Sequence, residues 1–178
     1  IEKIDALYKR KGHVTGLETS FSEFDKMTSG LQPSDLIIIA GRPSMGKSAL
    51  ASSILENIGI NLKKPVAFFS LEMSKEQLVQ RMICSQARVN AQSVRSGYLS
   101  PADWPKLTSA AGRLSSSQIF IDDTPAISAL ELRAKARRLK SHHDIQLIVL
   151  DYLQLMRGNT KTDNRQQEIS EISRSIKA

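Results

Sequence analysis

The chain has 178 residues, which suits one globular domain with a substantial core. Its 40% apolar and 24% charged residues are ordinary for a globular protein, and no apolar run approaches the roughly 20 residues that a membrane-spanning helix needs. The net charge of +7 favours a polyanionic partner, either a nucleotide alone or a nucleotide with nucleic acid, and the single Cys84 excludes an internal disulfide and suits a reducing, cytoplasmic setting.

The first 40 residues predict a helix end, a linker, a short helix and a strand. Apolar residues at helical spacing over 1–10 indicate the end of an amphipathic helix, and we expect the linker to finish at residue 14. The pattern Ser20-Phe-Ser-Glu23 is typical of a helix-capping box and begins an apolar stripe that includes Phe24. The short β-branched run at 35–40 predicts a buried strand.

The rest of the chain alternates buried strands with capped helices. Further strands are expected at 66–70, 119–122 and 147–151. Ser74 and Ser128 each stand at the start of a helical pattern in the cap position, and the chain closes with a helix that carries isoleucines on one face at 169, 172 and 176. This alternation predicts an α/β fold with a mostly parallel central sheet flanked by helices.

A phosphate-binding loop lies directly after the first expected strand. Its residues fit the pattern G-x-x-x-x-G-K-[ST] at every fixed position, in the order Gly41, Arg42, Pro43, Ser44, Met45, Gly46, Lys47, Ser48. The glycines allow a tight turn whose N–H groups point at phosphate oxygens, Lys47 reaches the β and γ phosphates, and the Ser48 hydroxyl binds Mg²⁺. A strand, this loop and a helix in succession predict a P-loop NTPase site for ATP and Mg²⁺.

Four acidic residues follow expected strands and are candidates for the rest of the site. Asp151 ends the strand at 147–151, where a carboxylate can hold Mg²⁺ directly or through water. Glu72 follows the strand at 66–70 and is equally compatible with activation of a water molecule and with an ordinary acid at a helix start. Asp122 and Asp123 also end a strand, but the adjoining Thr124-Pro125 favours a loop role.

Several strings in order resemble the C-terminal motor domain of the bacterial replicative helicase DnaB. They include Gly30-Leu-Gln-Pro-Ser-Asp-Leu, Arg42-Pro-Ser-Met-Gly-Lys-Ser, Phe69-Ser-Leu-Glu-Met, Asp151-Tyr-Leu-Gln-Leu-Met and Asn164-Arg-Gln-Gln-Glu-Ile. The resemblance implies a RecA-like domain over 15–178, preceded by the end of a linker helix and a linker over 1–14. It also implies that Glu72 is the water-activating glutamate.

The resemblance further implies a cytoplasmic homo-hexamer that hydrolyses ATP, moves on single-stranded DNA and meets a primase and a helicase loader. In the family, a further strand lies between the phosphate-loop strand and the strand that ends at Asp151. The chain stops at Ala178, before that strand, and it lacks an initiator Met. We therefore expect a fragment in which the C-terminal part of the fold is missing.

The loop that follows the strand at 147–151 is a candidate DNA contact. It carries Arg157, Lys161 and Arg165 among small polar residues, and an exposed loop with ordinary charges explains it equally well. The basic segment 133–140 is expected on the outer surface.

Two other functions are compatible with the sequence. A RecA-type recombinase or clock-type ATPase is the alternative enzyme, and a nucleotide-binding module that does not hydrolyse ATP is the alternative outside enzymes.

Overall fold

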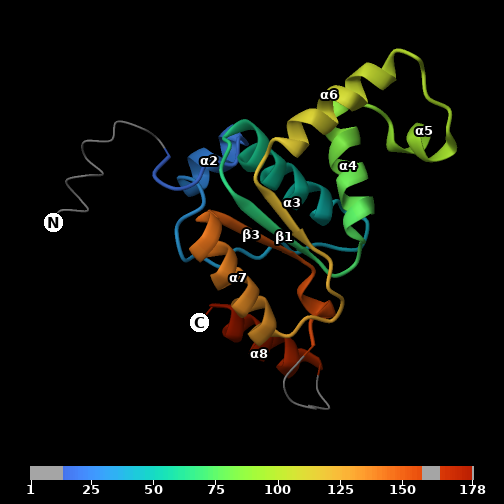
Figure 1. Ribbon diagram of the computed structural model, residues 1–178. Coiled ribbons are helices and arrows are strands. Elements are labelled where there is room, and N and C mark those ends of the chain that lie inside the picture. The colour runs from blue at the N-terminus through green and yellow to red at the C-terminus, as the bar shows by residue number, and fades with distance from the viewer. Residues whose placement is uncertain (1–13, 158–164, 178) are drawn as a thin grey trace.

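A computed structural model describes residues 14–157 and 165–177. The described residues form a parallel sheet of three strands: β1 (Val66–Ser70), β2 (Ile119–Asp122) and β3 (Leu147–Asp151). The strand order is β2-β1-β3, so β1 is central (Figure 1). The predicted strands at these three places and their parallel arrangement are confirmed.

Helices precede, connect and follow the strands. They are α2 (Ser22–Thr28), α3 (Lys47–Glu56) with a π-helical continuation (Asn57–Asn61), α4 (Lys75–Ala87), α5 (Ala91–Ser96), α6 (Asp103–Ser115), α7 (Ala129–His143), a 3-10 turn (Leu153–Leu155) and α8 (Arg165–Lys177). In the part of the chain that is described, no helix is long and apolar enough to cross a membrane. The expected helix over 1–10 lies outside the described residues.

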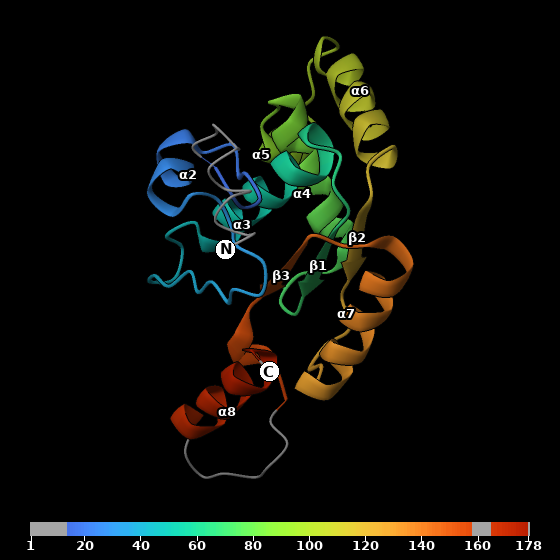
Figure 2. The same cartoon turned by 90° about the vertical axis from the view of Figure 1, so that its left-hand side faces the viewer.

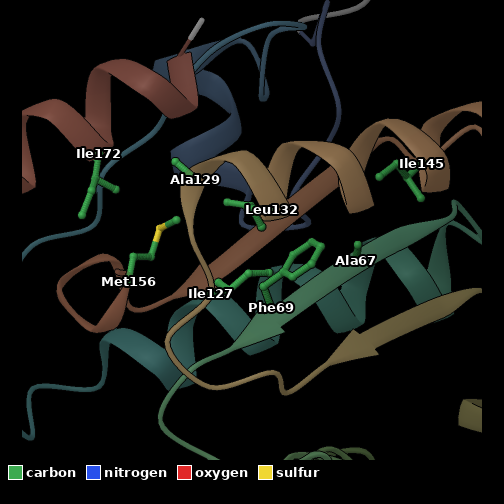
Figure 3. Close-up of a cluster of buried hydrophobic side chains, with 8 residues drawn as sticks. All are labelled: Ala67, Phe69, Ile127, Ala129, Leu132, Ile145, Met156 and Ile172. Atoms are coloured by element: carbon green, nitrogen blue, oxygen red, sulfur yellow. The ribbon is translucent and has the colours of Figure 1, made fainter. Parts of the chain in front are cut away.

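Alternate residues of β1 supply the two halves of the core. Ala67 and Phe69 face α7 and α8, where they meet Leu132 and a cluster that extends to Ile172 (Figure 3). Val66 and Phe68 face the opposite side and pack against α3 and α4. All of β1 is buried because helices cover both faces of the sheet, as its unbroken apolar sequence predicts.

A smaller cluster attaches α6 to the outside of α4. Leu107 and Ala110 of α6 are buried against Cys84 and Ala87 of α4. The α5 and α6 region therefore projects away from the sheet (Figure 1).

Two of the predicted helix caps are confirmed and one is wrong. The hydroxyls of Ser74 and Ser128 accept hydrogen bonds from the backbone N–H three residues on, at the starts of α4 and α7. Ser20, by contrast, has a left-handed backbone (φ 69°), and α2 begins without a side-chain cap. The buried carboxylate of Asp25 instead turns back and accepts the N–H groups of Thr19 and Ser20. The expected apolar stripe of α2 is exposed.

The predicted strand at 35–40 is wrong for this structure. Residues 35–40 are coil, and no strand of the described chain pairs with them. Their apolar side chains stay exposed, with Ile38 at 68%. A β-branched run becomes a strand only when neighbouring strands satisfy its backbone groups. The coil lies on the β3 side of the sheet (Figure 2), and the outer edge of β3 is also unpaired among the described residues.

Candidate nucleotide-binding site

The phosphate-binding loop leads directly into α3. Lys47 and Ser48 are the first two helical residues. Gly46 before them has a left-handed backbone (φ 86°), a conformation in which a residue with a side chain would be strained. At Gly41, a Cβ would make only ordinary contacts. The Lys47 ammonium donates to the carbonyl oxygens of Gly41 (3.0 Å) and Arg42 (3.1 Å), so the cation spans the loop.

The start of α3 suits an anionic ligand. No side chain caps its first N–H groups, which therefore keep their donor capacity and the positive end of the helix dipole. Residues 41–46 are exposed, and Lys47 and Ser48 are half-buried beside them. Backbone donors, a lysine and a serine hydroxyl together match the oxygen atoms of a nucleotide's phosphates and their Mg²⁺.

The parallel sheet brings the candidate acids to one edge. Ser70, the last residue of β1, is the register partner of Asp151, the last residue of β3. The pairing extends one residue further, because the Leu71 N–H donates to the Asp151 carbonyl at 2.7 Å. Glu72 comes next, and Asp122 ends β2 opposite Phe69. Glu72 and Asp151 therefore lie at the same edge of the sheet, because the carboxyl ends of parallel strands meet there. That Glu72 also faces the phosphate-binding loop, as the sequence predicts, stays a prediction.

Glu72 differs from Asp122 and Asp123 in having no hydrogen-bond or ion-pair partner in the part of the chain that the structure describes. Its side chain is exposed and makes no hydrogen bond or ion pair with any described residue. Asp122, in contrast, accepts Lys135 Nζ at 2.7 Å, and Asp123 accepts the backbone N–H of Lys75 at 3.0 Å. Burial alone would raise the pKa of Asp122, but the hydrogen bonds from Lys135 and Thr124 outweigh it and lower that pKa.

The structure does not join the two halves of the site. The coil at 35–40 leaves the phosphate-binding loop without the strand that would fix it at the edge where Glu72 and Asp151 lie.

The three predicted DNA contacts are only partly described. Arg157 is exposed, and its backbone pairs with Ser128 at the start of α7. Lys161 lies outside the described residues, and of Arg165 only the backbone, which begins α8, is described.

Ser70 is a residue of this edge to which the sequence assigned no role. It is 3% exposed, and its hydroxyl donates to the Met73 carbonyl at 2.7 Å. The sequence did carry a signal for this role, because Ser70 places a hydroxyl at the end of an apolar strand, two residues before a candidate base.

Comparison with known proteins agrees with this architecture. Residues 16–178 match the family model described as the DnaB-like helicase C terminal domain. The replicative DNA helicase DnaB of Geobacillus stearothermophilus is 53% identical over 178 residues, which cover 99% of this chain and 39% of that protein. The chain thus spans about two fifths of this relative.

Two solved structures have the same fold. A solved ATPase domain matches with a TM-score of 0.92 and 33% identity, over 99% of this chain and 63% of that one. The second structure is that of a DnaB-like replicative helicase, whose description also names its interactions with primase. It matches with a TM-score of 0.89 and 33% identity, over 99% of this chain and 44% of that one. The RecA-like fold is therefore confirmed, and the chain belongs to the DnaB-like helicase C-terminal domain family.

Proposed function

We propose that this chain is the ATP-hydrolysing motor of a replicative DNA helicase, which moves on single-stranded DNA and unwinds the duplex ahead of it. The observation that carries the proposal is the sheet edge where Asp151 ends β3 and Glu72 closely follows the end of β1, in a chain whose phosphate-binding loop leads into α3. Two similar proteins that are named replicative helicases support the same activity, and a third that is named an ATPase domain supports ATP hydrolysis.

Three residues would hold the nucleotide and its metal. The Lys47 ammonium would exchange the loop carbonyls for β and γ phosphate oxygens, and the N–H groups at the start of α3 would bind the same phosphates. Ser48 and Asp151 would hold Mg²⁺ through oxygen atoms, the ligands that this cation prefers. When bound, Mg²⁺–ATP supplies the phosphoryl group whose transfer to water releases the free energy for movement.

Glu72 is the proposed general base. A base must carry an ionised group that is free to orient a water molecule and to take its proton. Glu72 suits this role by its position, because it follows β1 at the edge where Asp151 lies and its exposed side chain makes no hydrogen bond or ion pair with the described residues. Asp122 and Asp123 are held by Lys135 and by the start of α4, so neither is available without breaking an existing contact.

The proposed partners follow from the family and from the loop after β3. We propose a homo-hexamer with sites shared between neighbours, a single-stranded DNA track, and contacts to a primase and a helicase loader in the cytoplasm. The name of one structural neighbour includes primase, which supports the primase contact. Arg157, Lys161 and Arg165 are the proposed DNA contacts. A cation from the neighbouring subunit can raise turnover roughly 10³-fold in such sites.

The experiment that tests the function is unwinding of a forked duplex by the full-length protein. We expect strand separation with Mg²⁺–ATP and none with a non-hydrolysable ATP analogue. Lys47→Ala removes the cation that follows charge onto the γ phosphate, so this variant should also fail to unwind. Equal unwinding by Lys47→Ala and the natural protein would reject the proposed motor.

A further inference from the structure

We propose that Ser70 and Asp123 are positioning residues that together hold the turn carrying Glu72. The inference rests on the proposed role of Glu72 as the general base. It concerns the short segment 71–75, which joins the end of β1 to the start of α4 and contains that glutamate. Neither residue is expected to touch the nucleotide.

The first anchor is at the strand end. The Leu71 N–H donates to the Asp151 carbonyl at 2.7 Å, which ties the residue before Glu72 to the backbone of the proposed metal ligand. The buried Ser70 hydroxyl donates to the Met73 carbonyl at 2.7 Å and accepts the Met73 N–H at 3.3 Å. The neighbours of Glu72 on both sides are therefore fixed by groups of the sheet.

The second anchor comes from a distant part of the chain. The Asp123 carboxylate, just after β2, accepts the Lys75 N–H at 3.0 Å across 48 residues of sequence. Lys75 is the first residue of α4, and its N–H has no partner within the helix. Asp123 thus fixes the far end of the turn and couples it to the end of β2.

These anchors matter because the Glu72 carboxylate makes no hydrogen bond or ion pair with the described residues. Its position must then be set by the backbone that carries it. A general base works only within hydrogen-bond reach of the water it activates, and a misplacement of about 1 Å can reduce a rate by about 10²-fold. A turn whose two ends are held by hydrogen bonds fixes the position of Glu72 before the substrate binds.

A matched pair of substitutions at Ser70 tests the first anchor in the full-length protein. Threonine keeps the hydroxyl, whereas valine has nearly the same shape and lacks it. We expect Ser70→Val to reduce kcat for ATP hydrolysis by about 10-fold or more relative to Ser70→Thr, with equal KM, while its Tm falls by the loss of the buried hydrogen bonds alone. Equal kcat values for the two variants would overturn the inference.

A second pair of substitutions tests the anchor at Asp123. Because Asp123 is not buried, these substitutions disturb the core less than those at Ser70. Asp123→Asn keeps an oxygen that can accept the Lys75 N–H, whereas Asp123→Ala does not. We expect Asp123→Asn to retain turnover close to that of the natural protein, and Asp123→Ala to lose about 10-fold in kcat. Unchanged kcat in Asp123→Ala would remove this anchor, and an inactive Asp123→Asn would indicate that Asp123 is itself the base.

The Glu72→Gln background separates positioning from general damage. If Ser70 acts through Glu72, Ser70→Val should cause no further loss in the residual single-turnover rate of Glu72→Gln, whereas damage to the fold would lower both backgrounds equally. Full turnover in Glu72→Gln would reject the proposed base. An inactive Glu72→Gln beside a fully active Ser70→Val would reject only the positioning role.

Discussion

Three serines show that the same helix-capping sequence pattern can lead to different local structures. Ser74 and Ser128 cap helices as their patterns predict, but the similar pattern at Ser20 does not. The difference is Asp25, whose carboxylate accepts two backbone N–H groups and the Thr19 hydroxyl (2.8 Å). The acid was visible in the sequence, but its hydrogen bonds to the Thr19 and Ser20 N–H groups, in place of a cap by the Ser20 hydroxyl, were not.

Asp25 should therefore be a major stabilising residue of this segment. Asp25→Ala leaves the N–H of the fully buried Thr19 without an acceptor, which should cost about 2–4 kcal/mol. Glu23→Ala is the matched control on the same helix, since it removes an exposed ion pair with Lys26 that is worth less than about 1 kcal/mol. Urea midpoints of the two variants measure the difference, and equal midpoints would contradict the role of Asp25.

At the scale of elements, helices α3 and α4 meet through a buried carboxylate. Glu56, the last residue of α3, is 3% exposed and accepts the Gln86 side-chain amide at 2.8 Å. Burial raises the pKa of Glu56 above its ordinary value, although hydrogen bonds from Gln86 and Ser85 oppose the shift. The contact joins the helix that begins with Lys47 to the helix that follows Glu72.

The pKa shift of Glu56 predicts a pH dependence of stability. Because the folded state holds this proton more tightly than the unfolded state, the contribution of Glu56 is greatest below its unfolded pKa and declines as the pH rises through the folded pKa. Glu56→Gln removes this decline, so its Tm relative to the natural protein should increase from pH 4 to pH 7.

Asp122→Asn provides a control of opposite sign. The pKa of Asp122 is lowered, so its contribution is present above the unfolded pKa and is lost as the pH falls through the folded one. The Tm deficit of Asp122→Asn should therefore shrink on acidification. The same trend with pH in both variants would contradict the two assignments.

The elements also show which parts of the site are predictable from sequence. Glu72 and Asp151 could be placed together because each follows a strand and the strands were expected to be parallel. The contacts of Ser70 and Asp123 could not, because they depend on the local path of one turn and on a 48-residue separation. Residues 35–40 were misjudged because their pattern specifies apolar burial but not the strand that must pair with them.

At the scale of the whole molecule, one edge of the sheet is open: the outer edge of β3 has no partner among the described residues. The coil that contains the exposed apolar run at 36–39 lies on this side of the sheet (Figure 2). A strand paired with β3 would satisfy this edge, and we expect residues 35–40 to join the sheet only when such a strand is present.

DNA binding is a property of the assembled molecule, and the loop after β3 is the proposed contact. Lys161→Ala should weaken single-stranded DNA binding equally for all sequences and lower the salt slope by about one unit, as expected for one phosphate contact. Arg137→Ala is the control, since Arg137 is exposed on α7, which we place on the outer surface. Reduced affinity in Arg137→Ala with unchanged affinity in Lys161→Ala would move the DNA site to α7.

The most direct test of the proposed motor is ATP turnover by the full-length Glu72→Gln protein, measured beside its affinity for Mg²⁺–ATP. Glu76→Gln is the matched control, because Glu76 is also exposed and lies in the first turn of α4. We expect Glu72→Gln to bind Mg²⁺–ATP normally and to lose at least about 10²-fold in turnover, while Glu76→Gln keeps both. Turnover in Glu72→Gln equal to that of Glu76→Gln would contradict the role of Glu72 as the base.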